Sequence, residues 1–277
     1  MPRLKLLLAY QGTAYSGWQI QALPKGDSPP TIQGELERAV AAIAGGRILV
    51  HGSGRTDSGV HAEGQVCHVD LPGETIGLDW QRALNSQLPP DIRILGTEIV
   101  DEDFHARFSA TGKCYSYALW HDAQRPLPRA REFVWSRPGL DQERMLEAAA
   151  LLTGTHDFAS FQNTGTPVES TVRTLYSVEA RQHCLGPLLC PEDWPVTSWF
   201  FIGDGFLKQM VRNLVGLLVW VGQGKIAPAG VPGILAAKDR RALPSPAAPA
   251  QGLTLMHVYY APVGECPDAY RTLPASL

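Results

Sequence analysis

The pattern of apolar and polar residues predicts the same order of elements in each half of the chain. In the first half, Ile32, Leu36, Ala39 or Val40, and Ile43 recur at helical spacing, and Gly45 and Gly46 end that helix. The strands expected here are 3–12, 47–54, 64–71 and 92–100, and the helices are 31–46 and 79–88.

The second half repeats this plan without repeating the sequence. Its expected strands are 113–121, 173–183, 198–203 and 252–260, and its expected helices are 141–154 and 206–223. A proline-rich excursion covers 186–195, and the Pro/Ala-rich segments 227–233 and 242–252 are expected to be connectors.

The order β-α-β-β-α-β, used twice, predicts an α+β fold. We expect two ferredoxin-like (RRM-like) units whose antiparallel sheets form a pseudo-symmetric core with a central cleft. The expected domains are 1–109, carrying an aspartate loop, and 110–265, followed by a tail at 266–277.

The loop "GSGRTDSGVHAEGQ", residues 52–65, is the first candidate site. Gly54 and Gly59 permit close approach of a ligand, but the lysine of a phosphate-binding P-loop is absent. Asp57 has two interpretations. It is typical of an ordinary turn, and, with Arg55 two residues away, it is also suited to act as an ionised nucleophile or cation stabiliser.

The segment "GFLKQMVRNLVGLLVWVG" is the second candidate. Its apolar stripe is Phe206, Met210, Leu214, Leu217 and Val221. Lys208 and Arg212 are expected on the opposite helical face, where like charges four residues apart suggest an anionic partner. The alternative is a solvated basic turn.

In "FHARFSATGKCYSYALW", His105, Arg107 and Lys113 are interleaved with aromatic residues. This composition suits a polyanion whose bases stack, but it also suits a strand with aromatics inside and charges outside. The histidines of the chain lack metal-ligand spacing, and we expect structural roles for them.

Composition restricts the functional classes. The net charge is −3, so a nucleic-acid-binding surface would have to be a local basic patch. The five cysteines include no CxxC pair, which disfavours a disulfide framework or zinc site and favours a reducing cytoplasm. The longest apolar run, at 214–222, is too short to span a bilayer, so we expect a soluble, cytoplasmic protein.

Together these segments resemble the tRNA pseudouridine synthase A family over nearly the whole chain. The motifs that carry the resemblance are "YQGTAYSGWQIQ", "TIQGELERAV", "GSGRTDSGVHAEGQV", "DFHARFSATGKCYSY", "GFLKQMVRNLVG" and "PAQGLTLMHVYY". Departures are Gln11 for a common aspartate, Lys113 for a common arginine and Asp204 for the usual asparagine.

The resemblance implies isomerisation of uridine to pseudouridine at positions 38, 39 and 40 of the tRNA anticodon arm. It also implies a homodimer without metal or cofactor. Asp57 would be the nucleophile on a flipped-out uridine, and Arg212 would orient it. Tyr115 would form the floor of the pocket and assist loss of the C5 proton.

Further substrate-binding residues are expected from the same motifs. Arg55 would fill the space of the flipped base or hold a phosphate, and Leu253 would line the pocket. Arg107 and Lys208 would contact phosphates. Two rival functions remain open: a non-catalytic RNA-binding module and an N-glycoside hydrolase, which would release free uracil.

Overall fold

The computed structural model describes residues 2–21, 29–75, 77–123, 126–163, 165, 168–182, 184–185, 188–189 and 194–263. The chain divides into two compact units. Unit 1 comprises the residues up to Thr111 together with Leu255–Pro262, and unit 2 comprises Gly112–Thr254 and Val263. Each unit combines helices with mostly antiparallel strands, which confirms the predicted α+β class.

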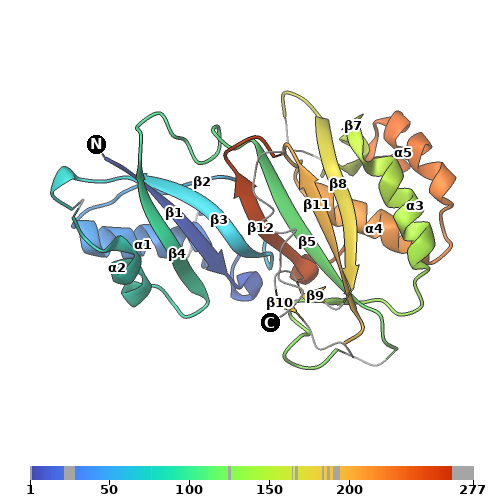
Figure 1. Cartoon of the computed structure of the whole chain (residues 1–277), viewed down its shortest axis with the longest axis horizontal. Helices are drawn as coiled ribbons and strands as arrows, with labels where there is room; N and C mark the ends of the chain where they lie inside the picture. The colour runs from blue at the N-terminus through green and yellow to red at the C-terminus, as the bar shows by residue number, and fades with distance from the viewer. Residues whose placement is uncertain are drawn as a thin grey trace. The chain divides into compact units, whose positions relative to one another are not determined.

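The sheet of unit 1 is centred on β1 (Arg3–Tyr10), which pairs antiparallel with β3 (His61–Asp70) and β4 (Ile92–Val100). The part of β12 (Leu253–Tyr259) from Leu255 onward lies beside β3, and β2 (His51–Gly52) also pairs with β3. Every second side chain of β1 is buried, as expected for a sheet with one covered face. Figure 1 shows α1 and α2 on one side of this sheet.

Both predicted helices of unit 1 are present, with ends within two residues of the expected ones. In α1 (Ile32–Ala44), the Thr31 side chain accepts a hydrogen bond from the Gly34 amide, and Gly45 ends the helix at φ 75°. In α2 (Trp80–Gln87), Asp79 accepts a hydrogen bond from the Arg82 amide. Local capping chemistry therefore fixes both helices.

Unit 2 contains an antiparallel sheet in the order β5 (Gly112–Trp120), β11 (Val196–Gly203), β8 (Val172–Gln182) and β7 (Gly154–Asp157). The short β6 (Trp135–Ser136) pairs with β5 in parallel. Figure 1 shows α3 (Gln142–Leu152), α4 (Met210–Gly222) and α5 (Val231–Ala237) together on one side of this sheet. A separate pair, β9 (Cys184–Leu185) and β10 (Leu188–Leu189), falls within and beside the proline-rich excursion.

Short 3-10 helices complete the described elements: η1 (Gly12–Ala14), η2 (Gly73–Thr75), η3 (Ala159–Phe161), η4 (Pro228–Gly230), η5 (Arg240–Ala242) and η6 (Ala250–Gly252). The expected tail at 266–277 lies outside the described residues.

Several expectations about elements were wrong. The strand expected at 47–54 is reduced to the two residues of β2, and β6 and β7 were not predicted. The helix expected from Phe206 begins at Met210, because Gln209 has φ 60° and breaks the helical geometry. The segment 227–233, expected to be a connector, instead contains η4 and the first three residues of α5, since a proline in the first turn of a helix needs no amide donor there.

Candidate active site

The loop that carries Asp57 is held by the end of β1 and the segment that follows it. The hydroxyls of Tyr10 and Thr56 are hydrogen-bonded at 2.8 Å, and the Trp18 amide donates to the Thr56 carbonyl oxygen at 3.1 Å. The Ser58 hydroxyl donates to the Tyr15 carbonyl oxygen at 3.1 Å. Bonds on both sides of Asp57 therefore fix the loop.

Two glycines allow these segments to approach. Gly17 has φ 91°, and a Cβ added there would lie 2.6 Å from the Thr56 carbonyl oxygen. A Cβ at Gly12 would lie 1.9 Å from the carbonyl oxygen of Val60. The "YQGTAYSGW" and "GRTDSGV" motifs therefore form one packed structure that no larger residue at these two positions would permit.

Gln65 supports the base of the loop from β3. Its side-chain oxygen accepts from the Ser53 hydroxyl at 2.7 Å, and its amide nitrogen donates to the Gly54 carbonyl oxygen at 3.2 Å. Tyr10 lies in the same buried network, and burial raises the pKa of its hydroxyl to about 12. Sequence reasoning missed Tyr10, Trp18 and Gln65, because polar supporting residues have no periodic signal.

Asp57 is half-buried and lies in a turn, where its carbonyl oxygen accepts from the Val60 amide at 3.2 Å. Arg55 and Ser58, on either side of it, are exposed. The turn interpretation of this segment is thus correct for the backbone. The Asp57 side chain is therefore carried by a loop that is fixed on both sides and is itself only partly buried.

Unit 2 supplies the aromatic residue predicted for the site. Tyr115 on β5 is 9% exposed, and its ring lies edge-to-face with Phe206 at 5.1 Å between centroids. In the strand register it stands opposite Phe201 of β11. Leu253, the first residue of β12, is buried. Both side chains thus belong to the packed part of this unit.

Arg212 lies in the first turn of α4 and is half-buried. Its Nε donates to the Ala248 carbonyl oxygen at 2.7 Å, and the Ala248 amide donates back to the Arg212 carbonyl oxygen at 2.9 Å. This reciprocal pair orients the guanidinium against the Ala248 backbone.

Lys208 precedes α4 and is exposed. The expected helical pairing of Lys208 with Arg212 is therefore wrong, because the backbone is not helical between them. The apolar stripe is confirmed from Met210 onward, since Met210, Leu214, Leu217 and Val221 are all fully buried.

Asp204, which departs from the family motif, has a structural role. Its Oδ1 accepts from the Thr174 amide at 3.0 Å, and its own amide donates to the Thr174 carbonyl oxygen at 3.1 Å. The carbonyl oxygen of an asparagine side chain could accept the same bond, so the exchange is compatible with this β8–β11 corner.

Arg107 and its neighbours form turns rather than a strand. Phe108 is 76% exposed, with the Arg107 guanidinium 5.5 Å from its ring centre. His68 Nδ1 accepts from the Ala106 amide, and His105 Nδ1 accepts from the Arg107 amide. These histidines hold the backbone, as expected. Among the described residues, no three ligating side chains are arranged to bind a metal ion.

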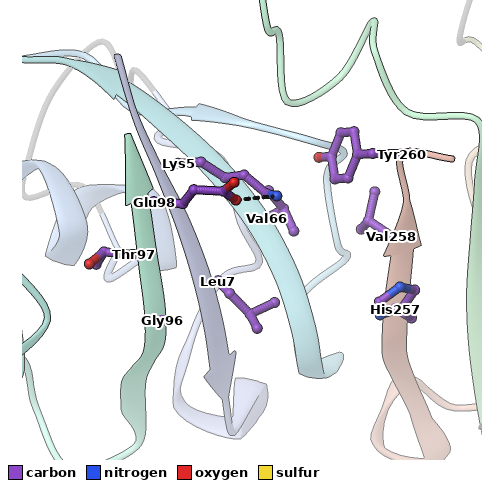
Figure 2. Close-up of a pocket in the computed structure, with 9 residues that line it drawn as sticks. All are labelled: Lys5, Leu7, Val66, Gly96, Thr97, Glu98, His257, Val258 and Tyr260. Carbon is purple, nitrogen blue, oxygen red and sulfur yellow. Dashed lines mark hydrogen bonds and ion pairs between the residues drawn. The ribbon is translucent and has the colours of Figure 1, made fainter. Parts of the chain in front are cut away.

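Unit 1 also contains a groove of about 410 Å³ on its sheet, distinct from the predicted site. Figure 2 shows Leu7, Val66 and Val258 in it, with Lys5 and Glu98 joined by an ion pair of 2.9 Å. None of the predicted site residues is among the described residues that line it. Because Lys5 is already paired, the groove adds no free cation for an RNA phosphate.

The geometry defines a class: an α+β protein that presents one aspartate on a rigid loop and arginines on exposed surface. Residues 7–109 and 148–261 match the family described as tRNA pseudouridine synthase, and the chain belongs to that family. This membership makes it an isomerase that acts on uridine in tRNA.

Relatives named tRNA pseudouridine synthase A match nearly the full chain. The protein of Oleidesulfovibrio alaskensis is 51% identical over 275 residues, covering 94% of this chain and 97% of its own length. That of Nitratidesulfovibrio vulgaris (strain Miyazaki F) is 49% identical, covering 94% and 100%. That of Geobacillus kaustophilus is 44% identical, covering 93% and 94%.

The structure groups the predicted residues by unit. Asp57 and Arg55 share one loop of unit 1, and Arg107 lies on another. In unit 2, Tyr115 comes from β5 and Arg212 from α4.

Within the described residues, no helix has both the length and the apolar character needed to cross a bilayer.

Proposed function

We propose that the protein converts uridine to pseudouridine at positions 38, 39 and 40 of the tRNA anticodon arm. The observation that carries the proposal is the placement of Asp57. It is half-buried on a loop whose preceding residue, Thr56, is packed against Gly17 and hydrogen-bonded to the Tyr10 hydroxyl. A carboxylate fixed in this way needs little reorganisation before it acts on a substrate.

The reaction needs one such carboxylate. The C1′–N1 glycosidic bond breaks, the uracil turns while bound, a C1′–C5 bond forms, and the C5 hydrogen leaves as a proton while N1 gains one. Asp57 acts as the nucleophile, at either C1′ of the ribose or C6 of the base. A hydrolase would use a second carboxylate to activate water, whereas an isomerase excludes water.

Tyr115 and Arg212 act with Asp57 on the same nucleotide. The uridine must leave its stack, at a cost of a few kcal/mol, and an aromatic floor offsets part of that cost. Tyr115, largely buried beside Phe206, provides this floor and assists loss of the C5 proton. Arg212 orients the Asp57 carboxylate. The Arg212 guanidinium is itself oriented by its hydrogen bond to the Ala248 carbonyl oxygen.

The remaining residues bind the RNA around the flipped base. Arg55 takes the vacated space or a phosphate, and Leu253 lines the pocket. Arg107 and Lys208, both exposed, contact phosphates. Such contacts explain how a protein of net charge −3 binds a polyanion.

The architecture proposed for this function is a pair of ferredoxin-like domains, 1–109 and 110–265, that form a central cleft. We further propose a cytoplasmic homodimer that grips the anticodon arm. The order β1-α1-β2-β3-α2-β4 of the first half supports the first proposal, and the family resemblance supports the second.

Tritium release from tRNA labelled at uridine C5 tests the proposal. Wild-type protein should release tritium without releasing free uracil, and sequencing should map pseudouridine to positions 38–40. Free uracil would indicate the hydrolase. Tight tRNA binding without tritium release would indicate the non-catalytic RNA-binding module.

A further inference from the structure

Arg137 of unit 2 lies beside β5, the strand that carries Tyr115. Arg137 directly follows β6, and its amide donates to the Trp120 carbonyl oxygen of β5 at 2.7 Å. Its guanidinium carbon lies 3.9 Å from the centre of the Trp135 ring. The side chain is half-buried, so strand pairing and an aromatic face both restrict it.

A chain of contacts links Arg137 to Arg212 within unit 2. Trp135 lies edge-to-face with Tyr117 at 6.2 Å, and Tyr117 is fully buried. The Tyr117 hydroxyl donates to the Pro249 carbonyl oxygen at 2.8 Å, next to the Ala248 carbonyl that holds Arg212. Arg137 and Arg212 thus approach the same tyrosine from different elements.

No carboxylate among the described residues pairs with Arg137. Its Nη1 donates only to the neighbouring Ser136 carbonyl oxygen, at 3.1 Å. Burial lowers the pKa of Arg137, and burial raises the pKa of Tyr117 while Arg212 and Arg137 both lower it. A half-buried guanidinium with no carboxylate partner among the described residues retains N–H groups that an anion can accept.

The stacking also determines what Arg137 offers a ligand. The guanidinium carbon lies over the indole ring of Trp135, 3.9 Å from its centre, and Nη1 is partly used by Ser136. The remaining N–H groups project from the edge of the plane, which is the geometry that phosphate oxygens accept.

We propose that Arg137 binds a backbone phosphate of the tRNA, as a substrate anchor on unit 2 beside the group formed by Tyr117 and Arg212. Trp135 holds the guanidinium over its ring, and two of the guanidinium N–H groups donate to the non-bridging oxygens. This proposal rests on the proposed function, which supplies tRNA as the ligand. It adds a phosphate contact that the sequence motifs did not single out.

The test is tRNA affinity against salt concentration for full-length wild type, Arg137→Gln, Arg137→Lys and Arg82→Gln. Arg82 is an exposed arginine of α2 and serves as the control for loss of one positive charge. Arg137→Gln should weaken affinity about 10-fold and reduce the salt slope by about one unit, because one phosphate contact is lost. Arg137→Lys should keep the slope, and Arg82→Gln should leave affinity and slope unchanged.

Thermal unfolding and light scattering separate the other roles of Arg137. A lower melting temperature of Arg137→Gln with an unchanged salt slope would overturn the proposal in favour of packing against Trp135. A change of oligomeric mass would overturn it in favour of a contact between copies of the chain. Tritium release by wild type is measured on the same tRNA, so failure of the proposed isomerisation is detected separately from failure of the anchor.

Discussion

Gly17 packs against Thr56 so closely that a Cβ at residue 17 would lie 2.6 Å from the Thr56 carbonyl oxygen. Thr56 directly precedes Asp57, and Gly17 has φ 91°, which L-residues adopt at a cost. The position of the Asp57 loop therefore depends on a residue 40 positions earlier in the chain.

Gly17→Ala should displace this loop. We expect turnover to fall at least 10-fold and the free energy of unfolding to fall by about 1–3 kcal/mol, from clash and backbone strain. Gly46→Ala is the matched control, because nothing lies within 4 Å of its Cβ position and its φ is not positive. Steady-state kinetics and urea unfolding measure both effects. Equal behaviour of the two variants would contradict the packing argument.

If Arg212 orients the Asp57 carboxylate as proposed, Arg212→Met should lower turnover by about 10²–10³-fold, because a preorganised charge is lost. Arg212→Lys keeps the charge but lacks the Nε that bonds Ala248, so its turnover should be intermediate. Single-turnover kinetics at saturating tRNA measure the chemical step. If both variants react at the wild-type rate, Arg212 has only a structural role.

Tyr115→Phe separates stacking from proton transfer. The ring contact with Phe206 remains, so tRNA affinity and melting temperature should change little. Turnover should fall by about 10²–10⁴-fold if the hydroxyl assists loss of the C5 proton. Near-normal turnover with normal affinity would limit Tyr115 to the pocket floor.

His68 should make stability depend on pH. Burial, then Arg3, His105 and His51, lower its pKa to about 4, while Asp70 opposes this shift. The unfolded chain therefore binds more protons between pH 4 and 6.5, and stability decreases as pH falls through that window. From pH 7.5 to 5 the loss from this group is about 2 kcal/mol.

His68→Asn is the variant that isolates this effect, because its side-chain oxygen can accept the Ala106 amide in place of Nδ1. The variant should lose less stability than wild type between pH 7.5 and 5, measured by urea unfolding at both values. The same loss in both proteins would show that other groups, such as the Arg3–Asp70 pair, cause the pH dependence.

The sequence predicts those elements whose signals are local. Capping at Thr31 and Asp79 and burial along α4 could be recognised from residue type and spacing. The start of α4 could not, because Gln209 adopts a left-handed conformation that favours glycine or asparagine in general.

The same distinction applies to the candidate site. Asp57 was identifiable from its motif, but the supports of its loop come from residues 10–18 and 65, which only tertiary packing brings together. Arg137 was missed because a two-residue strand has no detectable period. The signal that could have indicated Arg137 is its spacing of two residues from Trp135, which in an extended segment places both side chains on one face.

Asp57→Asn tests the central claim most directly. The amide keeps the size of the side chain but removes its charge and nucleophilicity. Tritium release from tRNA labelled at uridine C5 is measured for wild type and variant, with tRNA affinity measured in parallel and deamidation excluded by mass spectrometry. We predict release by wild type, no multiple turnover by the variant, and similar affinities. Sustained tritium release by intact Asp57→Asn would contradict the account.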